Sequence, residues 1–128
     1  MNLRDGHSRC DLGTRELAYL GDAVFELMVR DKLIADGIPF GSLNNIADKH
    51  VNAKAQSEMY HRIFTKLTNI EKSVIKRGRN LHTTARSKNA CVSEYRHATG
   101  LEVLFGYLYM NGDESRLREV FEMCTSTT

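Results

Sequence analysis

Several kinds of segment are missing from the sequence, and each absence removes a class of protein. No run of about 18 consecutive apolar residues occurs, so no transmembrane helix is expected. The first residues, MNLRDGHSRC, lack the apolar core of a secretory signal peptide, which predicts a cytoplasmic protein without a membrane partner. Cys10, Cys91 and Cys124 are odd in number and widely spaced. They therefore predict neither a disulfide framework nor a zinc site.

The signatures of several enzyme classes are missing as well. The chain has no Gly-rich phosphate loop, no nucleophile elbow and no ordered Ser-His-Asp set. It also has no internal repeat and no strand-like alternation of useful length, and its single proline, Pro39, lies in a loop over residues 37–41. A chain of 128 residues, 41% hydrophobic and 27% charged, can form one domain with its own core. We therefore predict a single all-α domain over residues 1–128, with five to seven helices and loose ends at 1–13 and 125–128.

Helical periodicity and capping residues place the helix boundaries. Thr68 and Glu71 form a capping box, because a Thr oxygen and a Glu side chain at this spacing satisfy the free amides of a helix start. The expected helices run from a cap at Thr14 or Asp11 to about Asp36, from Ser42 to about Leu67 in two pieces hinged near residues 50–52, from Thr68 to Gly78, from about Ser93 to Met110, and onward from a cap at Asp113.

The segment LAYLGDAVFELMVR, residues 17–30, is predicted to be a helix that is apolar on nearly every side. A helix of this kind belongs in the interior, where a carboxylate must be ion-paired, hydrogen-bonded or bound to a metal. Asp22 and Glu26 therefore require a partner. The main apolar face is expected to hold Leu17, Leu20, Val24, Leu27 and Met28, while Asp22 and Glu26 share the opposite stripe with Ala18, Val29 and Leu33.

The second apolar helix that carries a carboxylate is the one predicted from about Ser93 to Met110. Its core face holds Leu101, Leu104, Phe105 and Leu108, with Glu102 on the other side, and the small residues Ala98, Gly100 and Gly106 would admit a neighbouring helix backbone. Two carboxylates in one pocket repel each other unless they are protonated or neutralised by a cation. Magnesium is suitable because it accepts one or two carboxylates together with water and substrate phosphates. Ion pairing with Arg15, Arg30 or Arg96 is the alternative, and for Glu26 it is the favoured one.

Basic residues are concentrated in the segment 72–88, which contains no Asp or Glu. Arg and Lys neutralise phosphates, while hydroxyl and amide groups fix the position of a nucleic-acid backbone. Aromatic residues are scarce here, which favours recognition of a duplex over stacking on single-stranded bases. A solvated loop without a ligand is the alternative. The residues expected to bind RNA are Lys76, Arg77, Arg79, Asn80, Arg86 and Lys88.

Four motifs, LAYLGDAVFE, VNAKAQ, VIKRGRN and YRHATGLEVLFGYLY, occur in this order and span about residues 15–110. They resemble the ribonuclease III catalytic domain, and more closely Mini-ribonuclease III, the bacterial branch that consists of this domain alone. The resemblance implies a homodimeric, Mg²⁺-dependent endoribonuclease that cleaves double-stranded RNA, with Mn²⁺ as a substitute. It also implies that Asp22 and Glu102 are the catalytic, metal-binding acids, that Glu26 contributes through a bound water, and that Tyr19 contacts the second subunit.

The resemblance also implies a biological substrate, the precursor of large-subunit ribosomal RNA, and a ribosomal protein as a possible partner. The acid set is smaller than in the larger enzymes of the family, because Arg15, Ala18 and Thr99 stand where those enzymes carry carboxylates. Two alternatives to an enzyme remain. One is a non-catalytic double-stranded-RNA-binding or ribosome-assembly protein that retains the fold, and the other is a helical interaction protein with ion-paired acids.

Overall fold

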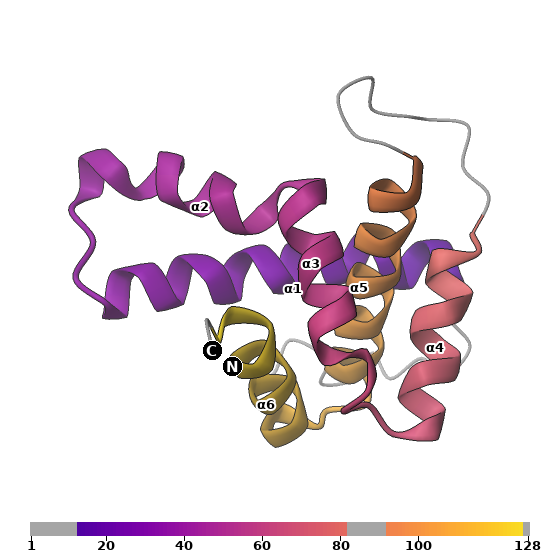
Figure 1. Ribbon diagram of the computed structural model, residues 1–128. Helices are drawn as coiled ribbons and strands as arrows, with labels where there is room; N and C mark the ends of the chain where they lie inside the picture. Colours follow the sequence, from indigo (N-terminus) through magenta and orange to yellow (C-terminus); the bar gives the residue numbers. More distant parts are fainter. Residues whose placement is uncertain (1–12, 82–91, 127–128) are drawn as a thin grey trace.

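Helix α5 lies at the centre of the computed structural model, which describes residues 13–81 and 92–126. It contacts α1, α3, α4 and α6, while α2 lies along α1 (Figure 1). No strand occurs in the described ranges, which confirms the predicted all-α class. The elements are α1 (Thr14–Ala35), the short 3-10 helix η1 (Phe40–Ser42), α2 (Leu43–Val51), α3 (Ala53–Phe64), α4 (Asn69–Arg79), α5 (Val92–Met110) and α6 (Glu114–Thr125).

The core forms around α5 because this helix is buried on nearly every side. Its predicted core face is confirmed, since Leu101, Leu104, Phe105 and Leu108 are all buried. The Phe105 ring lies edge-on to Phe25 of α1, with centroids 5.1 Å apart. Apolar side chains of this size contribute about 1.5–3 kcal/mol each when fully buried. The inward-facing side chains expected in α6, Leu117, Val120 and Phe121, are buried as well.

Helix α1 was predicted to lie in the interior, but several of its apolar side chains are exposed. Tyr19 is 87% exposed and Leu27, which we assigned to the core face, is 63% exposed. Val29 and Leu33, which we placed on the opposite stripe, are buried. Asp22 is exposed, so it is not an interior carboxylate. Hydropathy marked every apolar residue of α1 without distinguishing those that face the core from those that face outward.

Two of the predicted helix caps, at Thr68 and Asp113, are present in the structure, and the predicted cap of α1 is not. The Thr68–Glu71 capping box is present, with the Glu71 amide donating to Thr68 Oγ1 at 3.1 Å. Asn52 caps α3 at the expected hinge, and Asp113 caps α6. At the start of α1 the prediction is wrong, because Gly13 is the capping position and makes no side-chain cap. Helix α6 also continues through Thr125, which we had assigned to the loose C-terminal end.

A buried ion pair joins α4 to α6. The Arg116 guanidinium donates from Nη2 to Glu71 Oε1 at 2.7 Å and from Nε to Oε2 at 2.8 Å. Arg116 holds the pKa of the Glu71 carboxyl below its usual range. A buried carboxylate left without its partner is strongly destabilising, so this bidentate pair fixes the N-terminal end of α4.

The described helices include none that is long and apolar enough to cross a membrane.

The thiol of Cys124 is buried, and burial raises its pKa to about 12. Such a thiol is unreactive, as expected of a structural cysteine. Cys10 and Cys91 lie outside the described residues.

Candidate active site

Asp22 and Glu102 are brought together by a close crossing of α1 and α5. A Cβ atom at Gly21 would lie 1.6 Å from the Glu102 carbonyl oxygen, and one at Gly106 would lie 2.1 Å from the Leu17 carbonyl oxygen. Only glycine fits at either position, because both distances are far below van der Waals contact. The crossing therefore places the residue after Gly21 beside the side chain of Glu102.

The two carboxyl groups interact directly. Burial, the charge of Asp22 and a side-chain hydrogen bond between the two groups together raise the pKa of Glu102 to about 8, with burial the largest cause. At neutral pH Glu102 is therefore protonated, and its carboxyl O–H donates a hydrogen bond to the Asp22 carboxylate. Asp22 is exposed while Glu102 is half-buried, so the pair opens to solvent on the α1 side.

This pKa predicts how the metal-free protein responds to pH. Between about pH 4.5 and about pH 8 the folded state keeps a proton on Glu102 that the unfolded chain has released. The contribution of Glu102 to the free energy of unfolding is therefore expected to be largest below this window and to fall as the pH rises through it. Urea denaturation in EDTA at about pH 5 and about pH 8 measures the loss. Glu102→Gln is the control, because it has no proton to release and its decline over this range is expected to be smaller.

A hard divalent cation fits this pair. Among residues 13–81 and 92–126 there is no cluster of three or more His, Cys, Asp or Glu that could hold a metal ion. Two carboxylates are nevertheless a sufficient protein contribution for Mg²⁺, which keeps several water ligands. Thr99, at one of the positions where the larger enzymes carry an acid, supplies no carboxylate, and its hydroxyl donates to the Tyr95 carbonyl at 3.0 Å.

Glu26 lies on the surface of α1 and pairs with Arg30. The Arg30 guanidinium donates to Glu26 Oε1 at 2.9 Å across one helical turn, and both side chains are more than a third exposed. This is the ion-pair alternative that the sequence favoured for Glu26. A contribution of Glu26 to the metal through water would require it to share or break this pair.

The basic end of α4 is held against α5 by a second close crossing. A Cβ atom at Gly78 would lie 2.8 Å from the Gly100 Cα, and one at Gly100 would lie 2.8 Å from the Ile75 carbonyl oxygen. Gly78 lies between Arg77 and Arg79, and Gly100 lies two residues before Glu102. The predicted RNA-binding end of α4 and the acid pair are therefore anchored to the same helix.

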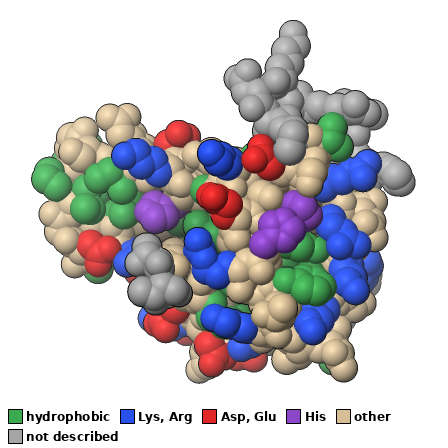
Figure 2. All heavy atoms as spheres, viewed as in Figure 1, with side chains coloured by type: hydrophobic (Ala, Val, Ile, Leu, Met, Phe, Trp, Pro, Cys, Tyr) green, Lys and Arg blue, Asp and Glu red, His purple; other side chains and the backbone are tan. Residues whose placement is uncertain are grey.

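Lys76, Arg77 and Asn80 are exposed and Arg79 is half-buried. Figure 2 shows Lys and Arg side chains gathered over α4. Basic residues in the last turn of a helix are also favoured by the helix dipole, so their position alone does not establish a ligand. Arg86 and Lys88, the remaining residues of the predicted RNA-binding set, lie outside the described residues.

A polar cluster between α3 and α5 was missed by the sequence analysis. Ser57 Oγ lies 3.1 Å from His97 Nδ1, and the His97 ring centroid is 4.4 Å from that of His61. Burial, followed by the charges of His61 and Arg79, lowers the pKa of His97. His97 is therefore neutral at pH 7 and adds no charge to the basic segment. The four-residue spacing of Ser57 and His61 was the only available signal.

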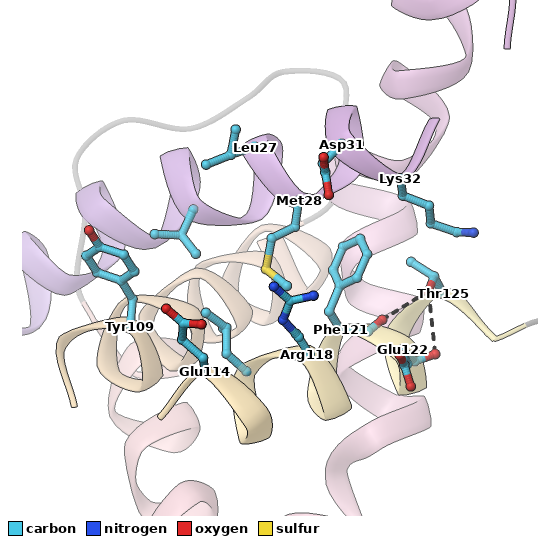
Figure 3. Close-up of a pocket in the computed structure, with 12 residues that line it drawn as sticks. Leu27, Met28, Asp31, Lys32, Tyr109, Glu114, Arg118, Phe121, Glu122 and Thr125 are labelled. Atoms are coloured by element: carbon cyan, nitrogen blue, oxygen red, sulfur yellow. Dashed lines mark hydrogen bonds between the residues drawn. The ribbon is translucent and has the colours of Figure 1, made fainter. Parts of the chain in front are cut away.

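A groove of about 510 Å³ runs between α1 and α6 (Figure 3). Leu27, Met28 and Tyr109 lie along it with Phe121, and charged side chains such as Asp31 and Arg118 border it. The acid pair does not line this groove. The exposed Leu27 therefore lies on a surface distinct from the candidate active site.

Comparison with known proteins identifies the class of this fold and site. The chain matches the ribonuclease III domain over residues 15–113. A crystal structure of a Fusobacterium nucleatum protein superposes with a TM-score of 0.78 at 34% identity, covering 88% of this chain and 91% of that one. The chain is therefore an endoribonuclease of the ribonuclease III type. That family generally uses divalent metal ions, acts on double-stranded RNA and is usually dimeric.

Curated relatives narrow the assignment. Mini-ribonuclease 3 of Thermoanaerobacter sp. (strain X514) is 42% identical over 84% of this chain and 76% of its own length. Mini-ribonuclease 3 of Brevibacillus brevis is also 42% identical, over 83% of this chain and 80% of its own. A Mini-ribonuclease 3-like protein of Ilyobacter polytropus is 38% identical over 88% of both chains. The chain belongs to the Mini-ribonuclease III family, as the four motifs predicted.

Proposed function

We propose that this endoribonuclease cleaves double-stranded RNA in a reaction that depends on Mg²⁺, with Mn²⁺ as a substitute. The direct contact between the Asp22 and Glu102 carboxyl groups carries the proposal. A protein that only binds RNA gains nothing from holding two carboxyl groups in contact, whereas such a pair supplies the one or two carboxylates that a Mg²⁺ site uses.

In the proposed mechanism, Asp22 and Glu102 would hold the metal. The bound ion would lower the pKa of the attacking water and neutralise charge on the scissile phosphate. Glu102 would have to release its proton to become a ligand, so ion binding is expected to strengthen as the pH rises toward 8. The cations at the end of α4 hold phosphates, and the crossing of Gly78 with Gly100 keeps them at a fixed place relative to Glu102.

Cleavage of a long RNA duplex by the purified chain tests this proposal. Products are expected with Mg²⁺ or Mn²⁺ and none in EDTA, because two carboxylates without a cation cannot activate water at neutral pH. Single-stranded RNA of the same sequence is the control substrate. Binding of the duplex without cleavage under any divalent ion would favour the alternative, a non-catalytic RNA-binding or ribosome-assembly protein.

Changing Arg77 and Arg79 to alanine is expected to weaken duplex binding. Each arginine that contacts a phosphate releases about one counterion, so the slope of log K against log salt should become shallower by about one per residue. Lys49→Ala is the control, because Lys49 is exposed on α2, away from α4. Fluorescence anisotropy over a salt series measures the effect. Unchanged affinity and slope at low salt would remove these two residues from the interface.

The finer parts of the proposal concern assembly and substrate. We propose a homodimer in which Tyr19 contacts the second subunit, which is supported by the exposure of Tyr19 and Leu27 on α1. A two-fold dimer would present one acid pair to each strand of a duplex. We further propose that the substrate is the precursor of large-subunit ribosomal RNA in the cytoplasm, with a ribosomal protein as a possible partner, and that Glu26 contributes through a bound water.

A further inference from the structure

Two aromatic side chains of α3 face the basic side of α4. The Tyr60 and Phe64 rings are stacked one helical turn apart, with centroids 5.7 Å apart and an angle of 18° between their planes. Tyr60 is 3% exposed and Phe64 is half-buried. We call this pair the aromatic shelf. The Tyr60 ring is packed in the core, and the Phe64 ring stacked on it is partly exposed at the surface.

Three cations of α4 contact the aromatic shelf. The ammonium groups of Lys72 and Lys76 each lie 5.6 Å from the centroid of the Phe64 ring. Arg79 Nη1 donates to the hydroxyl of Tyr60 at 3.3 Å. These residues are spaced at 72, 76 and 79, so they form one stripe of the helix. No ion pair joins any of them to a carboxylate within residues 13–81 and 92–126.

The arrangement has two physical consequences. A long basic side chain loses rotamer entropy when a ligand fixes it, and a contact already present in the free protein reduces that loss. Two ammonium groups over a single ring also repel each other, and in the described part of the chain no ion pair with a carboxylate relieves the repulsion. An anion between or beside them would do so. The stripe is therefore prearranged for a ligand with repeated negative charges.

We propose that Phe64 is a positioning residue for RNA: its ring holds Lys72 and Lys76 in place to bind the phosphates of a duplex, beside Arg79 on Tyr60. The inference rests on the proposed function, since it assigns the phosphate backbone of the same substrate. It adds Lys72 and the two aromatic residues of α3 to the interface. None of these three was among the RNA-binding residues expected from the sequence.

Binding of an RNA duplex of about 20 base pairs without divalent ions tests the inference. Phe64→Leu keeps an apolar side chain but removes the aromatic ring, and we expect about three- to tenfold weaker binding. The salt slope should stay unchanged, because both lysines are still present to displace counterions. Phe64→Tyr restores the ring and should bind as tightly as the wild type. Urea denaturation verifies that Phe64→Leu is folded.

A double-mutant cycle separates positioning from a general effect on the fold. In the Lys72→Met, Lys76→Met background, Phe64→Leu should cause no further loss of affinity, because the residues through which Phe64 acts are absent. An equal loss in both backgrounds would overturn the inference, as would wild-type affinity of Phe64→Leu. Failure of the wild-type chain to bind duplex RNA would instead contradict the proposed function itself.

Discussion

Cleavage of an RNA duplex is expected to fall by more than about 100-fold when Glu102 is changed to glutamine, while the fold and duplex binding survive. Losing a group that acts only through another ligand costs about 10–100-fold, and Glu102 is proposed to touch the metal itself. Glutamine keeps the size of the side chain and can still hydrogen-bond to Asp22, but it cannot supply a negative charge. Asp22→Asn should have the same effect, since either change leaves one carboxylate for the cation.

Single-turnover cleavage measures this loss, and binding measured separately shows that substrate is still held. Glu26→Gln is the control matched to Asp22→Asn, because both replace a carboxylate with an amide on α1 and the two positions are one helical turn apart. It is expected to lose no more than about 10–100-fold. Wild-type cleavage by either Asp22→Asn or Glu102→Gln would show that the acid pair is not the active site.

Gly21→Ala is expected to destabilise the protein by more than about 4 kcal/mol, which is exceptional for the addition of one methyl group. The new Cβ would lie 1.6 Å from the Glu102 carbonyl oxygen, which belongs to the backbone of a central helix and cannot rotate away. Helix α1 would have to move off α5, losing apolar contacts along the whole crossing. Any folded fraction should also cleave poorly, because Asp22 moves with α1.

Gly41→Ala is the matched control for this change. A Cβ atom at Gly41 would meet nothing within 4 Å, so the same substitution there should leave the stability within about 0.5 kcal/mol of the wild type. Thermal and urea unfolding of both variants provide the comparison. If Gly21→Ala were as stable as Gly41→Ala, the two helices would not cross as closely as described.

The parts of the fold that depend on local chemistry could be predicted from the sequence. The Thr68–Glu71 capping box and the Asn52 hinge need only residues a few positions apart, and both are present. The pair of Glu71 and Arg116 could not be predicted, because 45 residues separate its members and nothing in either segment specifies the other. Glu71 thus has a second role that its motif does not indicate.

The sequence motifs predicted which acids form the candidate site, but not how exposed those acids are. The order of the motifs indicated that Asp22 and Glu102 belong together, but the reasoning that Asp22 is buried was wrong. Apolar residues such as Tyr19 and Leu27 serve an outward face of α1, and hydropathy scores them like core residues. The aromatic shelf could not be predicted from the basic segment, because its rings lie on α3, several residues before that segment.

The two glycine crossings fix where α4 and α1 meet α5 along its length. Gly100 and Gly106 are six residues apart, which corresponds to about 9 Å along a helix. The distance along α5 between the proposed RNA-binding residues of α4 and the proposed catalytic acids is therefore set by the number of residues between the two glycines. Inserting a single residue between the two glycines would turn one crossing by about 100° relative to the other. The six-residue spacing of the two glycines is therefore expected to tolerate neither insertion nor deletion.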